Sequence, residues 1–496
     1  MAWALASPVG SSPDEDFHLT STWCGHGLRT GVCESGDEST SRKVSVSLLQ
    51  APCYAFKPDV SASCQGSGFA SAQGELVSTN RGNFKGDYPP VFYFFTSLFV
   101  GNDISFSVVV MRFANAALFV LMMAATYAAS APGLRRPLLL GFAVTAVPLG
   151  MFIVPSINPS GWAVLSAATL AVCVLGYMTS DDRQRRLVLG ALAAVSLLIG
   201  AGARADAAMY AVIAIGAALI LSVRGWGKYL RRGIYPVVLA VIATFAYFSA
   251  DQSSAAGGSS PQPFSLGRVV RILVDVPDLW AGAVGRWGLG WLDTSMPALV
   301  WVAAFGILAA TIYSGLWGAD LRRGLAVGAV GLALWVVPAY VQYLSGADVG
   351  TGVQPRYILP LLTLLAVIAL ARVDGMAFQL GVGQRWIMVG ALSAANAVAL
   401  YYNMRRYLTG TDVHSLSLDA LREWWWRMPV PPDAVWIGGT LAFGLGLVLL
   451  TRELTLVSPA GRASVGGGAP AAVGASDDVP RVDLALADGT VHGSET

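Results

Sequence analysis

Long apolar segments alternate with short polar ones over most of the chain, from about residue 105 to residue 451. Each apolar segment has few charges and approaches the roughly 20 residues that a helix needs to cross a bilayer. The pattern predicts eleven transmembrane helices, at about 105–130, 137–154, 161–179, 187–203, 207–223, 233–250, 297–317, 324–344, 357–371, 384–403 and 433–451.

The first hundred residues follow a different pattern. Residues 1–10 are apolar but too short to span a bilayer. We interpret them as the stub of an additional helix at the start of the chain, which would bring the total to twelve. Residues 11–87 are polar and rich in Ser and Gly, which predicts a long loop with little regular structure. The sequence Tyr88-Pro89-Pro90 then precedes an aromatic run at 91–95. This order predicts a short interfacial helix that completes an extracytoplasmic loop over 11–104.

Composition supports a membrane protein. Of 496 residues, 55% are hydrophobic and 12% are charged, whereas soluble domains carry roughly 25% charged residues. We therefore expect an all-α integral membrane protein of about 11–12 transmembrane helices, with a polytopic domain over 105–451. The net charge of +2 gives no indication of nucleic-acid binding. Residues 452–496 lack periodicity, which predicts a disordered cytoplasmic tail.

Basic residues predict the orientation in the membrane. Arginine pairs occupy alternate short loops, for example Arg135 with Arg136 and Arg322 with Arg323, and such loops are usually cytoplasmic. Residues 11–104, 251–296, 345–356 and 404–432 then lie outside. The last of these segments carries four arginines, against the rule. Within it, 417–426 resembles an amphipathic helix whose tryptophans either anchor it at the headgroups or contact a lipid substrate.

Four of the five cysteines fall in the polar N-terminal segment: Cys24, Cys33, Cys53 and Cys64. Four cysteines permit three pairings. Short loops favour Cys24 with Cys33 and Cys53 with Cys64, and free thiols are the alternative. Zinc is disfavoured because no histidine partners stand at zinc-like spacing. Disulfides form in oxidising compartments, which agrees with an outer location for this segment.

The segment 12–18 holds three carboxylates and a histidine directly after the stub. Asp14 and Glu15 are candidate catalytic bases, and His18 is a candidate substrate-binding residue. Charge at the mouth of a helix bundle is costly to desolvate and favours a functional explanation. The alternative is a solvated acidic loop. Asp14, Glu15 and His18 are also candidate ligands for a divalent cation, Mg²⁺ or Mn²⁺.

Further polar residues lie at the predicted outer ends of the helices. These candidate substrate-binding residues are Arg112, Asn158, Arg204, Asp206, Asp293, Gln354 and Arg356. Each has a local explanation, such as an Arg204–Asp206 pair or a snorkelling Arg112, but together they predict a polar cavity that opens outward. A carboxylate can deprotonate a hydroxyl, and arginine binds phosphate in a fork. That chemistry suits glycosyl transfer from a lipid-phosphate sugar. The chain contains no HExxH, GxSxG or CxxC motif and no phosphate-binding glycine loop.

Three short stretches resemble the domain-of-unknown-function 2142 family of bacterial membrane proteins. Residues 13–18 resemble its "PPDExxH" signature, 290–297 its "GxLDTxLP" stretch and 352–360 its "GxQGRYxxP" stretch, with Pro355 in place of the usual glycine. That family resembles the GT-C superfamily of polyprenyl-phosphate-sugar glycosyltransferases, in which a "hPPl" element similar to 88–90 follows the acidic motif. The resemblance implies Asp14 or Glu15 as acceptor base and Arg356 as the ligand of the lipid phosphate.

Our leading hypothesis is a glycosyltransferase for hexosyl or pentosyl transfer in the bacterial cytoplasmic (inner) membrane. Its expected partners are a polyprenyl-phosphate-linked sugar, membrane lipid and an envelope glycan acceptor. A transporter or flippase for a lipid-linked glycan is one alternative, and it requires a polar path to the cytoplasmic side. A non-catalytic scaffold of envelope synthesis is the other.

Overall fold

A computed structural model describes residues 1–66, 69, 74–223, 226–250, 265–346, 349, 353–373 and 378–455. The chain divides into two compact units, residues 1–456 and 457–496. Of the predicted tail, 452–455 belong to the last turn of a helix and the remainder lies outside the described residues.

Within the described residues, ten helices are long and apolar enough to cross a membrane. They are α5 (Ile104–Ala129), α6 with η2 and α7 (Pro132–Thr145, Ala146–Gly150, Met151–Ile153), α8 (Ser160–Thr179), α9 (Arg183–Ala201), α10 (Ala205–Ser222), α11 (Trp226–Ser249), α14 (Ala298–Leu316), α15 (Leu321–Ser345), α17 (Val382–Leu408) and α18 (Pro432–Thr455). An eleventh, α16 (Pro355–Leu370), is shorter. Each of the eleven predicted spans overlaps one of these helices, so the predicted all-α multi-pass fold is confirmed.

The helices divide into buried and lipid-exposed classes. Nearly all of α8 is buried, and so is most of α16, which packs against α6 and α8. In contrast, only 17% of the most apolar stretch of α18 and 22% of that of α15 are buried. Many apolar side chains on those outer helices are exposed, for example Leu332 and Leu441, as expected where lipid is the solvent.

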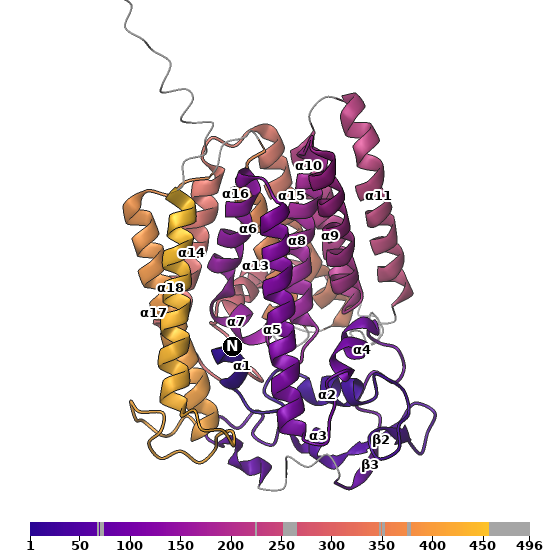
Figure 1. Cartoon of the computed structure of the whole chain (residues 1–496), viewed down its shortest axis with the longest axis vertical. Coiled ribbons are helices and arrows are strands. Elements are labelled where there is room, and N and C mark those ends of the chain that lie inside the picture. The colour runs from indigo at the N-terminus through magenta and orange to yellow at the C-terminus, as the bar shows by residue number, and fades with distance from the viewer. Residues whose placement is uncertain are drawn as a thin grey trace, which may run out of the picture. The chain divides into compact units, whose positions relative to one another are not determined.

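Successive helices run in alternate directions, and α2, α3, α4 and the strands gather at one end of the bundle (Figure 1). We call this the cysteine end, because both disulfides lie in the segment that forms it. The segments predicted to lie outside that the structure describes, including the α17–α18 connection, share this end. The shared end is what the predicted topology requires.

The N-terminal segment contains more structure than its composition suggests. After α1 (Ala2–Leu5) come α2 (Glu15–Trp23), β1 (Glu34–Ser35), β2 (Arg42–Ser45), α3 (Val46–Gln50), η1 (Ala62–Gln65), β3 (Leu76–Thr79) and α4 (Val91–Ser97). The strands form an antiparallel sheet in the order β1-β2-β3, with Arg42 opposite Thr79. The prediction of little regular structure was therefore wrong. Disulfides Cys24–Cys33 and Cys53–Cys64, both confirmed, restrain this segment, and buried Leu19 and Trp23 pack it.

Two further elements differ from expectation. A helix, α13 (Leu266–Ala283), lies within the predicted loop 251–296, where Ile272, Val276 and Leu279 form a buried stripe. The predicted helix over 417–426 is absent. Several of its backbone N–H groups bond outside the segment instead: Leu418 N donates to Asp433, and Glu423 N donates to the carbonyl of Leu408. These tertiary bonds replace the i to i−4 ladder.

Candidate functional site

The helix α2 begins at an ion pair with a distant helix. Asp14 precedes α2 in a left-handed conformation, with φ of 59°. Its Oδ2 accepts from Nη2 of Arg356 at 2.6 Å, and its Oδ1 accepts from Nη2 of Arg81 at 3.1 Å. The Asp14 side chain is 37% exposed, whereas that of Arg356 is 3% exposed. The carboxylate is thus open to solvent, and one of its two partners is buried.

Local structure places both members of this pair. Arg356 is the second residue of α16, and Pro355 occupies the first helical position, where proline is favoured. Gly282 at the end of α13 leaves room for the proline ring, because a Cβ there would lie 2.5 Å from Pro355 Cγ. On the other side, Asn158 Nδ2 donates to the carbonyl of Pro13 at 2.9 Å and fixes the residue before Asp14.

Arg356 retains hydrogen-bonding capacity. Its Nη2 also donates to the hydroxyl of Tyr357 at 3.0 Å, but its Nε and Nη1 are buried and have no partner among the described residues. Buried N–H groups of a guanidinium without acceptors are unfavourable and uncommon. They provide donors for an anionic ligand beside Asp14.

A second arginine joins this pair through an aromatic ring. The guanidinium of Arg204 lies 4.7 Å from the ring centroid of Tyr357 and 5.7 Å from that of Tyr88, and Arg356 lies 4.9 Å from Tyr357. Arg204 also forms a forked pair with Asp206, at 2.8 and 2.6 Å. We call the connected residues the polar cluster: Asp14, Arg81, Tyr88, Arg204, Asp206, Arg356 and Tyr357.

His18 lies beneath this cluster rather than on it. The side chain is buried, and its Nδ1 lies 2.9 Å from the hydroxyl of Tyr93. Burial lowers the pKa of His18 to about 3, and the positive charges of Arg356 and Arg204 add to the effect against the opposing charge of Asp14. The imidazole is therefore neutral at ordinary pH and positions α2 against α4.

The surroundings of Glu15 indicate a structural role. It is fully buried, its Oε1 lies 3.1 Å from Arg112 Nη2, and its Oε2 accepts from Ser12 N at 2.7 Å. Arg112 also donates to the carbonyls of Ala4 and Pro8. Both oxygens of Glu15 have donors and neither faces solvent, so this geometry leaves Asp14 as the candidate base. Arg112 correspondingly holds the N-terminal segment on α5 and does not reach the polar cluster.

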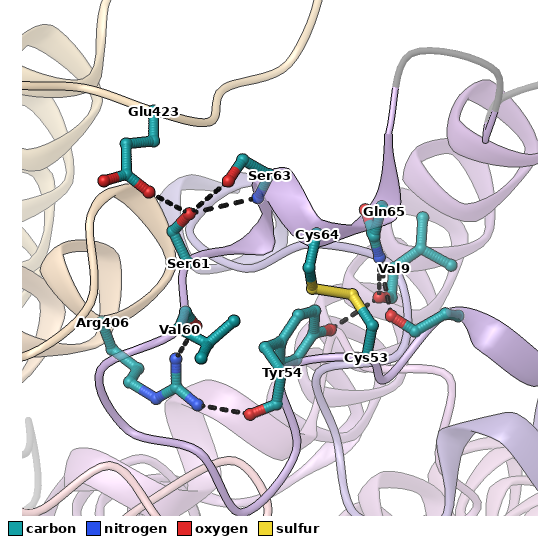
Figure 2. The surroundings of a disulfide bond; sticks show 11 residues. Val9, Cys53, Tyr54, Val60, Ser61, Ser63, Cys64, Gln65, Arg406 and Glu423 are labelled. Atoms are coloured by element: carbon teal, nitrogen blue, oxygen red, sulfur yellow. Dashed lines mark hydrogen bonds between the residues drawn. A yellow bond between two sulfur atoms is a disulfide. The ribbon is translucent and has the colours of Figure 1, made fainter.

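Asp293 belongs to a different ion pair. Its Oδ2 lies 2.8 Å from Arg406 Nη2 and accepts from Phe56 N at 3.1 Å. Arg406 also donates to the carbonyls of Tyr54 and Val60 in the loop that Cys53 and Cys64 close (Figure 2). Asp293 thus anchors the disulfide loop. Gln354 is the residue before α16, next to the polar cluster in sequence, and its buried Oε1 has no partner in the part of the chain that the structure describes.

The polar cluster does not suit a divalent cation. Guanidinium groups contact both oxygens of Asp14, and Glu15 and His18 are directed to Arg112 and Tyr93. No group of three His, Cys, Asp or Glu side chains converges within the described ranges. We therefore derive no step through Mg²⁺ or Mn²⁺.

Several residues of the cluster escaped sequence reasoning. Tyr357 stands directly after Arg356 in the motif over 352–360, and that adjacency was the available signal. Tyr88 was identified only as part of an interfacial element. Arg81 lies in an irregular polar stretch, and nothing in the sequence indicated its contact with Asp14.

Comparison with known proteins identifies the family. The family model DUF2142, described as predicted membrane protein, matches residues 1–365. No curated protein and no solved structure matches. The matched region includes Asp14, Arg204 and Arg356, and it covers well over half of the 496 residues. The chain, a multi-pass membrane protein, therefore belongs to the DUF2142 family of predicted membrane proteins.

Proposed function

We propose that this protein is a membrane glycosyltransferase that moves a sugar from a polyprenyl-phosphate donor to a cell-envelope glycan or lipid on the outer face of the bacterial cytoplasmic membrane. The observation that supports this proposal is the contact between Asp14, a partly exposed carboxylate, and Arg356, a buried arginine with two donors that have no partner within the described ranges. Glycosyl transfer from a phosphate donor needs both groups at one place.

In this proposal, Asp14 takes the proton of the acceptor hydroxyl while the acceptor oxygen bonds to the anomeric carbon. The bond between that carbon and the phosphate oxygen breaks, and the polyprenyl phosphate leaves with the electron pair. Arg356 stabilises the charge on the departing phosphate through Nε and Nη1, two buried donors to which no described residue offers an acceptor. Arg204, linked to Arg356 through Tyr357, lies on the same side, and its forked pair with Asp206 offsets its positive charge.

The electrostatics of Asp14 suit a base that acts after donor binding. Burial by itself raises the pKa of Asp14, but the positive charges of Arg356 and Arg81 outweigh it, and the pKa is lowered. A low pKa makes a weak base. A phosphate bound to Arg356 offsets part of that positive charge, so the carboxylate becomes more basic once the donor is in place.

The test is transfer by the full-length protein in proteoliposomes that contain synthetic polyprenyl-phosphate sugars. Release of polyprenyl phosphate together with a glycosylated acceptor is expected for the wild type and should be lost in Asp14→Asn. Asp37→Asn is the control, because its pairing with Lys43 is exposed. Sugar transfer by Asp14→Asn at the wild-type rate contradicts the proposal. Exchange of the donor across the membrane without bond cleavage supports the transporter alternative.

A further inference from the structure

A groove of about 510 Å³ lies at the cysteine end, away from the polar cluster. Three elements line it: the start of α5 with Phe106 and Val109, the η1 loop with Ser63 and Gln65, and the segment 423–428. We call it the tryptophan groove, after the three consecutive tryptophans of that segment, Trp424, Trp425 and Trp426. Its volume falls within the range of sites that hold small molecules.

Hydrogen bonds fix the walls of this groove. Ser61 Oγ donates to Glu423 Oε2 at 2.5 Å, which ties the η1 loop to the tryptophan segment (Figure 2). The disulfide Cys53–Cys64 closes the η1 loop behind that contact. Trp426 Nε1 donates to the carbonyl of Leu5 at 2.8 Å. The groove is therefore formed before any ligand binds.

The surroundings of the groove indicate a lipid as the occupant. Val109 and Phe106 stand in the first turns of a membrane-spanning helix, and Phe106 is 70% exposed. Tryptophan prefers the depth of the lipid headgroups. An apolar wall that continues the bilayer and ends in a polar rim matches a molecule with a hydrocarbon chain and a polar head.

The charged side chains at the rim of the groove indicate which lipid headgroup it binds. Asp103 accepts from Phe106 N through Oδ1, and Glu423 accepts from Ser61 through Oε2. The second oxygen of each carboxylate has no donor among the described residues. Arg427 adds one positive charge to the lining. Two carboxylates, indole faces and one guanidinium complement an ammonium group next to a phosphate.

We infer that the tryptophan groove binds a zwitterionic phospholipid with an ammonium headgroup, such as phosphatidylethanolamine. The acyl chain lies against Phe106 and Val109, the ammonium faces Asp103 and Glu423, and the phosphate faces Arg427. This site is separate from Asp14, and its occupancy does not depend on glycosyl transfer.

Lipid retention tests the inference without any transferase assay. The full-length protein is placed in nanodiscs of equal phosphatidylethanolamine and phosphatidylglycerol, extracted in mild detergent, and examined by native mass spectrometry. We expect preferential retention of one phosphatidylethanolamine. Val109→Trp should fill the groove and reduce retention about fivefold or more. Val120→Trp, on the same helix at a position 61% exposed and outside the groove lining, is the matched control.

Further substitutions test which lipid headgroup the groove prefers. Asp103→Asn with Glu423→Gln should remove the preference for phosphatidylethanolamine, whereas the exposed Glu38→Gln should keep it. Phosphatidylethanolamine with a photoreactive acyl chain should label residues 103–109 or 423–428 of the wild type. Equal lipid retention by Val109→Trp and Val120→Trp, preference for phosphatidylglycerol, or labelling confined to other segments would overturn the inference.

Discussion

Arg356 and Asp14 are 342 positions apart in the chain, and Nη2 of Arg356 lies 2.6 Å from Oδ2 of Asp14. This contact joins the start of α16 to the start of α2, two elements near opposite ends of the region that defines the family. The two groups differ in their surroundings: the carboxylate is partly exposed, whereas the guanidinium is buried and two of its donors have no partner among the residues described. In the proposed reaction the pair takes two kinds of ligand, a hydroxyl at Asp14 and an anion at Arg356.

The first prediction concerns the role of Arg356. Arg356→Lys keeps the charge but loses the planar fork that places donors on two phosphate oxygens. We expect the apparent affinity for a polyprenyl-phosphate donor to fall about tenfold or more, because charge-assisted hydrogen bonds contribute about 1.5–3 kcal/mol each. Donor titration of the transfer rate in proteoliposomes measures this. An unchanged donor dependence would show that Arg356 does not contact the phosphate.

The second prediction concerns pH. The pKa of Asp14 is lowered in the folded protein, because the positive charges of Arg356 and Arg81 outweigh its burial. Base activity is therefore present above that lowered pKa and is lost as the pH falls through it. Arg81→Gln removes one of these charges, so the acid limb of the rate profile should move to higher pH. Measurement of the transfer rate between pH 3 and 7 checks the direction, and a shift to lower pH contradicts it.

The same shift has a consequence for stability. A carboxylate with a lowered folded pKa stabilises the protein above its unfolded pKa, roughly 3.9, and this contribution is lost as the pH falls through the folded value. Asp14→Asn should therefore flatten the acid side of a plot of melting temperature against pH. Thermal unfolding in detergent, followed by tryptophan fluorescence, measures it, with Asp37→Asn as the control.

The third prediction concerns Glu15 and Arg112, the buried pair behind the polar cluster. Removing one partner leaves a buried charge, which typically costs about 3–5 kcal/mol. Glu15→Ala should therefore lower the melting temperature strongly. Asp37→Ala, which removes the exposed pair with Lys43, should change stability by about 1 kcal/mol or less. Similar losses in both variants would contradict the structural role of Glu15.

Adjacent Asp14 and Glu15 also show where sequence reasoning reaches its limit. Both carboxylates belong to one motif, and from the sequence both are assigned the same candidate role. Successive residues at a helix start point about 100° apart, so one can face solvent while the other is buried. Which one is buried depends on Arg112 from α5, and that tertiary contact cannot be derived from the spacing.

The membrane-spanning helices could be predicted because burial in lipid requires long apolar segments, whichever neighbours a helix has. The helix α13 could not be predicted in this way. Its apolar residues are interrupted by four charged ones, Arg268, Arg271, Asp275 and Asp278, so it contains no apolar segment long enough to span a bilayer.

Cysteine pairing was predictable because only short loops had to close. The hydrogen-bond partners of Arg406 were not predictable, because they are backbone carbonyls of the disulfide loop and the sequence of that loop has no periodic pattern.

The fourth prediction concerns the loop closed by Cys53 and Cys64. A loop of about this length contributes roughly 2–4 kcal/mol through its disulfide. The double change Cys53→Ser with Cys64→Ser should also loosen Tyr54 and Val60, whose carbonyls accept from Arg406. We therefore expect faster proteolysis within residues 53–66 and a lower melting temperature. Equal protection of that segment in the variant and the wild type would contradict this.

The last prediction uses the contact between Gly282 and Pro355, directly before Arg356. A Cβ at position 282 would lie 2.5 Å from Pro355 Cγ and 3.0 Å from Trp287 Cγ, closer than such atoms approach. Gly282→Ala should therefore push the start of α16 away from α13 and lengthen the Asp14–Arg356 contact. Overpacking of this kind typically costs about 1–3 kcal/mol. The expected result is a lower melting temperature together with weaker donor binding.

A second substitution, at Pro355, distinguishes this displacement of α16 from a general loss of stability. Pro355→Gly removes the ring that the new methyl group would meet. The effects of Gly282→Ala and Pro355→Gly should then be non-additive, with the double variant closer to the wild type in donor affinity than Gly282→Ala alone. Gly306→Ala is the control, because a Cβ there meets nothing within 4 Å. Additive losses would show that Gly282 affects Arg356 by some other route than Pro355.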